Sequence, residues 1–295
     1  MATLPDLSRE IAQLADRLAP SVVRVDARPG RPATGIIWAD NLVLTADHVI
    51  EQDDTIQVTG SQATLKASVV GRDAGTDLAL LRTEGPRGAP AARGRATDVR
   101  PGHLVLALGN SGGDLQVTFG IVSGLSGSFR SWRGGQVDGL IQTTAELLPG
   151  FSGGPLVDAE GRVIGVNSWN FGQGVSRAIP VETAEKVAES LLAHGRIRHA
   201  YLGLGAQPIR LSEVLAQQLG QESGLLVVTV EADGPAARAG LSQGDTIVTV
   251  DGDRVRHLDE LFAKLRALDV GSVHQFSVVR AGELKDVTVT VGERS

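Results

Sequence analysis

Residues 147–157 read Leu-Leu-Pro-Gly-Phe-Ser-Gly-Gly-Pro-Leu-Val and place one hydroxyl side chain, Ser152, between glycines and ahead of an apolar run. Glycine adopts positive φ without steric cost and lets another molecule approach the backbone closely. Two backbone N–H groups in such a loop can point at one spot and stabilise an oxyanion. Serine and glycine are also ordinary turn residues. The stretch therefore indicates either a nucleophile loop or a simple turn before a strand.

A catalytic serine requires a base and a group that orients the base. His48 follows one apolar segment of the chain, and Asp77 enters another. Asp47 is adjacent to His48 and is an alternative orienting group. Neighbouring residues of a strand point to opposite faces, which favours Asp77 over Asp47. The pattern thus predicts a triad in the chain order His48, Asp77 and Ser152.

Three separated motifs resemble the HtrA (Deg) family of chymotrypsin-like serine proteases. The family carries T-x-A-H-V at its histidine, D-L-A-[VL]-L at its aspartate and G-N-S-G-G-P-L-V at its serine. This chain carries T-A-D-H-V, D-L-A-L-L and G-F-S-G-G-P-L-V at the same places. Asp47 and Phe151 stand where the family usually has Ala and Asn, and Thr144 and Leu148 replace its usual Asp and Asn. None of the four is a triad residue, so they bear on substrate preference and loop order.

The resemblance implies a role for each site residue. Ser152 is the expected nucleophile, His48 the general base, and Asp77 the group that holds the imidazole in the right tautomer. The N–H groups of Gly150 and Ser152 are the expected oxyanion hole. The implied function is a serine endopeptidase that cleaves unfolded or misfolded proteins, with polypeptide substrates and C-terminal peptides as partners. The family's N-terminal segment further implies a homotrimer.

Residues 109–113 read Gly-Asn-Ser-Gly-Gly and spell the family's serine motif more faithfully than residues 150–154 do. Asp114 follows instead of Pro-Leu-Val, however. Residues 115–123 then alternate as a half-buried strand and resemble the family's T-V-T-x-G-I-V-S segment, which follows a glycine-rich turn in relatives. Ser111 is therefore assigned to a turn and not to the nucleophile.

The composition bounds the class of protein. The chain has 295 residues, enough for two domains, of which 42% are hydrophobic and only 3% aromatic. Its core must be mostly Val, Leu, Ile and Ala, which suits barrels and sandwiches. A formal net charge of −6 argues against a nucleic-acid partner. Because there is no cysteine, disulfides and cysteine-based metal sites are excluded. We expect neither a cofactor nor a metal ion.

The first 20 residues have an apolar stripe without a long apolar run. Apolar residues recur there at spacings of three and four, which predicts a helix: Leu4, Leu7, Ile11, Leu14 and Leu18. The segment resembles neither a signal peptide nor a transmembrane helix. Taken as written, the chain is expected to be cytoplasmic and without a membrane segment. It would be exported if a targeting segment had been trimmed, since HtrA relatives are often exported or membrane-anchored.

Short segments rich in Val, Leu and Ile, separated by Gly, Asp and Pro, fill residues 21–122 without a βαβ rhythm. Many short strands without helices favour a barrel. A helix over residues 183–194 is expected to close this part, with a linker over residues 195–199. We predict a mainly β protein, with a chymotrypsin-like double β-barrel protease domain over residues 1–198 and a small α+β domain over residues 199–295.

Residues 234–252 closely resemble the G-x-A-x-x-A-G-L-x-x-G-D-x-I-x-x-[VI]-[ND]-G signature of bacterial PDZ domains. The resemblance implies that backbone N–H groups of one loop hold the carboxylate of a C-terminal peptide, which adds a strand alongside. That loop comprises Tyr201, Leu202, Gly203 and Leu204. A helix that bears Leu261 and Leu265 is the expected other wall. A PDZ domain that docks only on its own protease domain is the alternative.

A strand is expected over residues 163–169. The first specificity pocket is expected to take its walls from this strand and from the loop before Ser152: Leu147, Leu148, Val166, Asn167 and Ser168. Apolar walls favour small aliphatic residues before the scissile bond. Glu146 lies six residues before Ser152, where trypsin-type enzymes carry the acid that selects Arg or Lys. An unpaired carboxylate buried among apolar groups is costly, so we prefer the aliphatic pocket.

Two other classes of function are weighed against the protease. A proteolytically silent scaffold or chaperone-like peptide binder would keep the fold without the chemistry, but the intact triad argues against it. An esterase is disfavoured because a PDZ domain implies protein substrates. The glycine-rich loops 124–139 and 170–174 can reorder without steric strain, and in HtrA relatives such loops pass a signal from the PDZ domain to the active site.

Overall fold

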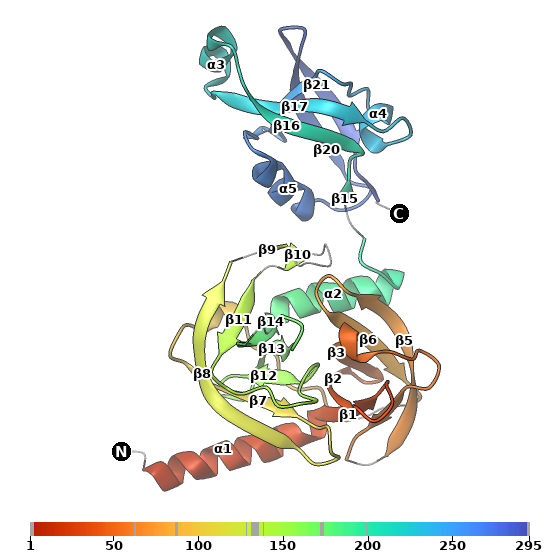
Figure 1. Cartoon of the computed structure of the whole chain (residues 1–295), viewed down its shortest axis with the longest axis vertical. Helices are drawn as coiled ribbons and strands as arrows, with labels where there is room; N and C mark the ends of the chain where they lie inside the picture. Colours follow the sequence, from red (N-terminus) through yellow and green to blue (C-terminus); the bar gives the residue numbers. More distant parts are fainter. Residues whose placement is uncertain are drawn as a thin grey trace. The chain divides into compact units, whose positions relative to one another are not determined.

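The computed structural model describes residues 3–61, 63–85, 88–127, 129–130, 136–137, 139–171, 174–198 and 200–293. The chain divides into two compact units, Met1–Ile197 and Arg198–Ser295 (Figure 1). Parts of the two predicted signalling loops, including Trp132 and residues 172–173, lie outside the described residues, as does His199 of the predicted linker.

Helix α1, Leu4–Leu18, forms within the predicted N-terminal helical segment. A reciprocal cap fixes its start, because the Thr3 hydroxyl accepts from the N–H of Asp6 and the Asp6 carboxylate accepts from the N–H of Thr3. Leu14 is buried against the barrels. The helix passes into a 3₁₀ turn, η1 (Ala19–Ser21), because Pro20 cannot continue the α-helical hydrogen bonding.

Six antiparallel strands close the first barrel in the order β1-β2-β3-β6-β5-β4. Their bounds are Val22–Asp26 (β1), Ala33–Ala39 (β2), Leu42–Ala46 (β3), Gln57–Thr59 (β4), Thr64–Asp73 (β5) and Leu78–Thr83 (β6). The 3₁₀ turn η2, Asp47–Val49, follows β3 directly and carries His48. Because β3 is paired on both edges, with β2 and β6, it gives this turn a rigid base.

Six more strands close the second barrel in the order β11-β14-β13-β12-β7-β8. Their bounds are Leu104–Gly109 (β7), Gln116–Ser126 (β8), Leu140–Thr143 (β11), Pro155–Val157 (β12), Val163–Asn167 (β13) and Ser176–Pro180 (β14). Three shorter elements belong to the same unit: η3 (Ala96–Asp98), β9 (Phe129–Arg130) and β10 (Gln136–Val137). The two closed barrels confirm the predicted chymotrypsin-like architecture.

Helix α2, Val181–His194, packs against β5 and β6 of the first barrel and β13 of the second (Figure 1). It ends at Gly195, whose φ of 70° terminates a helix at little cost. Leu44 and Leu80 of the first barrel belong to the same buried cluster as Leu108 and Val166 of the second. Aliphatic side chains thus form a shared core beneath the ends of the strands that carry the site, as the low aromatic content predicts.

Two predicted boundaries differ from the structure. Strand β8 continues to Ser126, inside the segment predicted as a loop from Gly124, because its end pairs with Leu140 of β11. Strand β13 stops at Asn167, whereas the apolar pattern suggests a strand through Trp169. The side chain of the next residue, Ser168, belongs to the site described below.

The second unit is a five-stranded antiparallel sheet in the order β16-β17-β18-β20-β21, with β19 beside β18 and a separate pair β15-β22. The strands are Ala200–Tyr201 (β15), Leu204–Arg210 (β16), Ser223–Val230 (β17), Thr246–Val250 (β18), Asp253–Arg254 (β19), Val273–Arg280 (β20), Glu283–Thr290 (β21) and Gly292–Glu293 (β22). The helices are Glu213–Leu219 (α3), Pro235–Arg238 (α4) and Leu258–Ala267 (α5). This is the small α+β fold that the sequence predicts.

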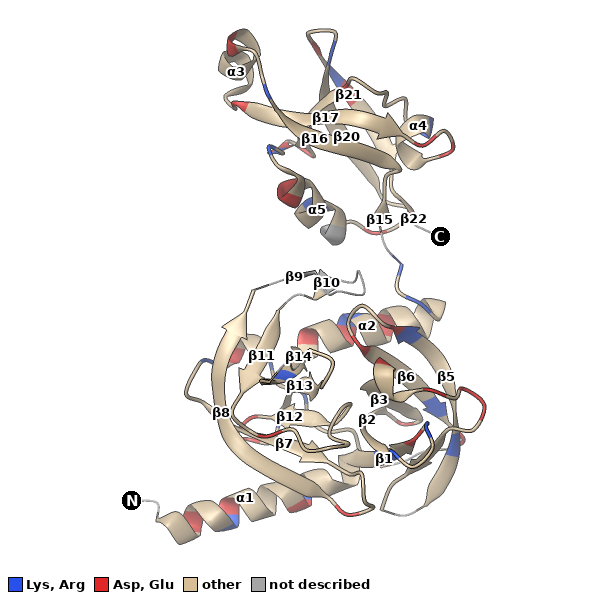
Figure 2. Ribbon diagram, in the orientation of Figure 1, with Lys and Arg blue, Asp and Glu red and all other residues tan. Residues whose placement is uncertain are grey.

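Acidic and basic residues are interspersed over the ribbons of both units (Figure 2). Among the residues that the structure describes, each helix is too short or too polar to cross a lipid bilayer.

Candidate active site

Asp77 is the centre of the site, and its side chain is fully buried at the start of β6. Its carboxylate accepts hydrogen bonds from Nδ1 of His48 at 2.8 Å and from the backbone N–H of the same residue at 3.0 Å. A carboxylate can only accept, so the Nδ1 atom of His48 carries a proton and Nε2 faces outward as the free base. The arrangement fixes the imidazole in the tautomer that a general base needs.

The backbone of Asp77 is in the left-handed region, with φ of 59°. Aspartate visits this region more readily than most residues, but the conformation still costs free energy. The carbonyl of Asp77 accepts from the N–H of Asp47 at 3.0 Å, which ties the turn before β6 to the turn after β3. The turn before β6 and the turn after β3, which bring Asp77 to His48, therefore also hold Asp77 in its strained conformation.

Asp47, the alternative orienting group, lies elsewhere. Its carboxylate is buried and accepts from Nε of Arg72 at 2.6 Å, and the guanidinium also donates to the carbonyl of Ile50. Asp47 therefore connects the η2 turn to β5 and does not orient the imidazole. The unusual aspartate in the histidine motif is explained by a guanidinium partner across the barrel wall.

Consecutive residues after β13 reach two members of the predicted triad. The hydroxyl of Ser168 donates to Oδ2 of Asp77 at 2.5 Å, and the backbone N–H of Trp169 donates to Oγ of Ser152 at 3.2 Å. Asn170 adds a 3.3 Å bond from Nδ2 to Asp77. In the described part of the chain, no hydrogen bond joins Ser152 to His48; such bonds often tighten only when substrate is bound.

The loop that carries Ser152 is a tight turn. The N–H of Phe151 donates to the carbonyl of Leu148 at 3.0 Å, and Gly150 has φ of 89°. Phe151 is fully buried, and its ring lies where a side chain on Gly109 would be. Gly153 likewise faces the backbone of Ala46, so the loop packs directly on the end of β3.

The two predicted oxyanion donors make no hydrogen bond in the described part of the chain. Neither the N–H of Gly150 nor that of Ser152 has an acceptor among the described residues. Ser152 is buried except for 4% of its surface, so its N–H lies in an environment where hydrogen bonds act strongly. The turn can therefore offer two unpaired donors to an incoming oxyanion.

Most of the predicted pocket walls are buried within the fold. Val166 and Leu147 are buried in aliphatic cores, and Asn167 and Ser168 are fully buried. Only Leu148 of the five is partly accessible. The predicted pocket therefore remains a prediction.

Trp169 lies over this region. Its side chain is 54% exposed, and its indole N–H donates to the carbonyl of Leu147 at 3.1 Å. Because its backbone also binds Ser152, Trp169 bridges the two segments expected to line the pocket. Glu146, the alternative selector of basic residues, is exposed. The apolar pattern of residues 163–169 predicts that Trp169 lies near the pocket. No sequence signal indicates the hydrogen bond from its indole to the carbonyl of Leu147.

Ser111 lies in the turn between β7 and β8, as the sequence predicts. Within the described ranges, no group of three or more side chains of His, Asp or Glu is suited to hold a metal ion.

In the second unit, the predicted carboxylate loop connects β15 to β16, and β16 is one of the two terminal strands of the sheet. Gly203 has φ of 72°, and the N–H groups of Leu202 and Gly203 lack acceptors in the part of the chain that the structure describes. Leu202, Gly203 and Leu261 are buried, whereas the other three predicted contacts are partly exposed: Tyr201, Leu204 and Leu265. Helix α5 contacts β16.

Comparison with known proteins gives two family matches. Residues 33–166 match a trypsin-like peptidase domain, and residues 201–291 match a PDZ domain. The chain is 36% identical over 267 residues to "Probable periplasmic serine endoprotease DegP-like" of Halomonas elongata, which covers 88% of this chain and 55% of that protein. A protein of the same name from Ectopseudomonas mendocina is 35% identical over 98% of this chain and 64% of its own length. The chain thus spans little more than half the length of these curated relatives.

A solved structure described as "HtrA-type protease AlgW with decapeptide" has the same fold, with a TM-score of 0.77. It is 30% identical in sequence to this chain, and the match covers 96% of this chain and 98% of that one.

Proposed function

The chain belongs to the HtrA family of trypsin-like serine proteases, and on this premise we propose that it is a serine endoprotease that cleaves unfolded or misfolded polypeptides. The observation that carries the proposal is the buried carboxylate of Asp77, which binds both Nδ1 and the backbone N–H of His48. Such an arrangement holds the imidazole in the orientation and tautomer of a general base.

The chemistry follows from this geometry. Nε2 of His48 takes the proton of the Ser152 hydroxyl as Oγ attacks the scissile carbonyl, and the imidazolium then protonates the leaving amine. Asp77 stabilises the imidazolium. Water repeats the sequence on the acyl-enzyme and releases the second product. The free N–H groups of Gly150 and Ser152 support their assignment as the oxyanion hole.

We propose a first pocket that accepts small aliphatic residues. The exposed position of Glu146 supports this choice, because a carboxylate that selects Arg or Lys must face the pocket base. The indole of Trp169, bonded to the carbonyl of Leu147, supports a shallow pocket. Leu148 is the predicted wall residue that remains partly accessible.

The second unit is proposed to bind C-terminal peptides and to tune the protease. The terminal strand β16 offers backbone groups to an added strand, and the unpaired N–H groups of Leu202 and Gly203 suit a terminal carboxylate. The solved relative is described with a decapeptide, which supports peptides as partners. Docking of the unit on its own protease domain remains the alternative.

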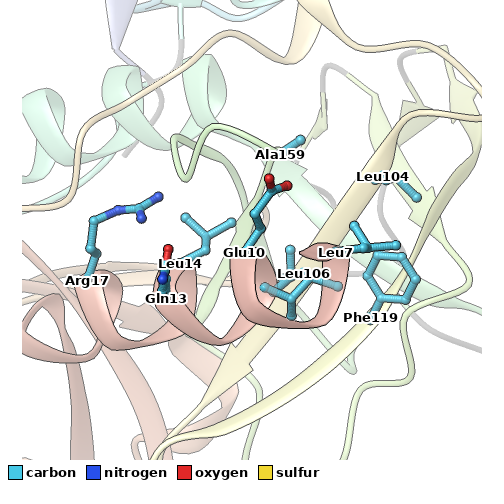
Figure 3. Close-up of a pocket in the computed structure, with 10 residues that line it drawn as sticks. Leu7, Glu10, Gln13, Leu14, Arg17, Leu104, Leu106, Phe119 and Ala159 are labelled. Carbon is cyan, nitrogen blue, oxygen red and sulfur yellow. The ribbon is translucent and has the colours of Figure 1, made fainter. Parts of the chain in front are cut away.

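Homotrimer assembly through the N-terminal region is proposed on the resemblance and on one surface feature. Helix α1 leaves an open groove against β7 and β8, where Leu7, Leu106 and Phe119 lie together (Figure 3). Phe119 is 46% exposed, and Leu4 at the tip of α1 is 82% exposed. Apolar area of this kind is typical of an interface between subunits.

The expectation of a cytoplasmic protein is wrong. The curated relatives are named periplasmic endoproteases, and that name overturns an assignment that rested only on the polar character of residues 1–20. We propose the periplasm as the site of action.

Active-site labelling tests the proposed function. A fluorophosphonate probe reacts with an activated serine, and mass spectrometry locates the adduct. We expect labelling on Ser152, none in Ser152→Ala, and full labelling in Ser190→Ala, which changes a serine of α2 outside the site. Absence of labelling in the folded wild-type chain would favour the proteolytically silent peptide binder.

A further inference from the structure

The direction of the Gly150 N–H decides whether the oxyanion hole exists. In the turn closed by Phe151 N–H and Leu148 carbonyl, Gly150 has φ of 89° and occupies the third position. The peptide group that joins Pro149 to Gly150 is planar and trans, so its carbonyl and its N–H point in opposite directions. A hydrogen bond that fixes the Pro149 carbonyl therefore also fixes the direction of the Gly150 N–H, which points the opposite way.

Ser111 contacts this peptide group from outside the loop. Its hydroxyl donates to the carbonyl of Pro149 at 3.3 Å. A Cβ atom built on Gly150 would lie 2.3 Å from the Cβ of Ser111, so the turn rests directly against the serine side chain. The same hydroxyl lies 3.4 Å from Oε1 of Gln116, which is a weaker alternative acceptor.

Thr34 holds the next carbonyl along the loop. Its hydroxyl donates to the carbonyl of Gly150 at 2.7 Å and accepts from the N–H of Asn110 at 2.8 Å. The side chain is fully buried, and its backbone N–H donates to the carbonyl of Ser152 at 3.2 Å. One buried hydroxyl thus connects strand β2, the end of β7 and the nucleophile turn.

We propose that Thr34 and Ser111 are positioning residues for the oxyanion hole, which fix the carbonyls on either side of Gly150 and so aim its N–H at the reacting centre. The inference rests on the proposed function. Neither residue touches substrate or the reacting atoms. Hydrogen-bond donors that are held in place before reaction stabilise the transition state without a reorganisation cost.

Substitution of Thr34 separates positioning from binding. In Thr34→Val the shape is kept and the hydroxyl is lost, so the Gly150 carbonyl loses its donor and the Gly150–Phe151 peptide group is held only through the N–H of Phe151. Removal of an oxyanion donor costs about 100- to 1000-fold in kcat, and we expect about tenfold to 100-fold here because the donor is misdirected and not removed. KM stays within about twofold, since ground-state binding is unchanged. Thr34→Ser keeps the hydroxyl and restores kcat.

The test includes a matched control and a second variant that can be used if the first does not fold. Thr83→Val removes another buried hydroxyl of the first barrel, which donates to the carbonyl of Gly85 at 2.9 Å, and should leave kcat unchanged. If Thr34→Val does not fold, Ser111→Ala remains available, because Ser111 is half-buried and its loss leaves no buried group unpaired. We expect Ser111→Ala to lower kcat several-fold.

Binding of a peptide boronate, which mimics the tetrahedral intermediate, gives the second readout. Its affinity should fall in parallel with kcat in Thr34→Val and Ser111→Ala, while the affinity of an uncleaved substrate peptide is unchanged. Unchanged kcat and boronate affinity in folded variants would overturn the inference and leave the protease assignment intact. A wild-type chain that neither reacts with fluorophosphonate nor cleaves peptides would instead refute the proposed function.

Discussion

The hydroxyl of Ser168 donates a 2.5 Å hydrogen bond to Oδ2 of Asp77, the same oxygen that lies 2.8 Å from Nδ1 of His48. Both partners are fully buried, so the bond acts in a medium of low polarity. The sequence predicts Ser168 as a wall of the substrate pocket. In the structure its side chain also joins His48 and Asn170 as a donor to the carboxylate of Asp77, and β13 ends at Asn167, the residue before it.

Removal of this hydroxyl should slow catalysis without weakening substrate binding. We expect Ser168→Ala to lower kcat about tenfold, because hydrogen bonds to charged groups contribute about 1.5–3 kcal/mol and the carboxylate keeps its other donors. KM should be unchanged. Steady-state kinetics on one peptide substrate measure both, with Ser190→Ala as the control. An equal rise in KM would show that Ser168 acts as a pocket wall after all.

Substitution of Asp77 should mainly lower catalytic activity, whereas substitution of Asp47 should mainly lower stability. Asp77→Asn replaces one acceptor oxygen by an NH2 donor and so favours the wrong imidazole tautomer, and we expect a loss in kcat on the order of 10⁴-fold with little change in the fold. Asp47→Asn leaves Arg72 without its buried partner and should lower the free energy of unfolding by about 3 kcal/mol. Urea unfolding and kinetics on both variants test the contrast, which fails if Asp47→Asn is the more severe for kcat.

Trp169 should limit the size of the residue before the scissile bond. In Trp169→Ala the bridge to the Leu147 carbonyl is lost. We expect cleavage after Leu and Met to rise about tenfold relative to cleavage after Ala, since an apolar pocket separates side chains by about 1–3 kcal/mol per methylene. Glu146→Ala is the control. Strong cleavage after Arg that disappears in Glu146→Ala would contradict the aliphatic pocket.

The ion pair of Asp245 with Arg280 should make the second unit acid-sensitive. Burial opposes ionisation of Asp245, but bonds from Arg280 and from the N–H of Ser242 outweigh it and lower the pKa of Asp245 from its ordinary value of 3.8. A carboxyl group with a lowered pKa stabilises the fold above its unfolded pKa, and this stability is lost as pH falls through the folded pKa.

Asp245→Asn should therefore weaken the second unit at pH 7, where the carboxylate is ionised, by about 3 kcal/mol. The difference from wild type should shrink as pH drops below 3.8, where the wild-type carboxylate itself begins to be protonated in the unfolded chain. Hydrogen exchange, followed by mass spectrometry on β18 and β20, reports the unit's stability in the intact chain. A difference that does not change with pH would contradict the assigned role of the ion pair.

Peptide binding to the second unit should depend on a free terminal carboxylate. A peptide with an apolar C-terminal residue should bind at least about tenfold more tightly than its C-terminal amide, because the N–H groups of Leu202 and Gly203 complement a negative charge. Calorimetry with the full chain measures both. Equal affinities would favour a unit that docks only on its own protease domain.

The barrels and the order of the triad could be predicted because their signals are local. His48 and Asp77 lie at the ends of apolar segments, and Ser152 lies among glycines, so short windows of sequence carry the pattern. The contacts of Thr34 could not be predicted in this way, because Asn110 and Gly150 reach it from distant parts of the chain. The sequence around a hydroxyl residue on a buried strand does not indicate which loops will contact it.

Phe151 illustrates the same limit. Phe151 stands where the family usually has Asn, and the sequence alone does not explain this difference. In the structure the ring is fully buried where Gly109 leaves room, so two positions that lie 42 apart in the sequence are complementary. Likewise Asp47 is explained only by Arg72, which approaches from β5.

Digestion of an unfolded protein tests the central claim most directly. Casein is incubated with the wild-type chain and with Ser152→Ala, each with and without a peptide that ends in an apolar residue, and the fragments are identified by mass spectrometry. We expect fragmentation by the wild type and none by Ser152→Ala, with circular dichroism spectra that coincide. Fragmentation by Ser152→Ala at the wild-type rate would contradict the assignment of Ser152 as the nucleophile.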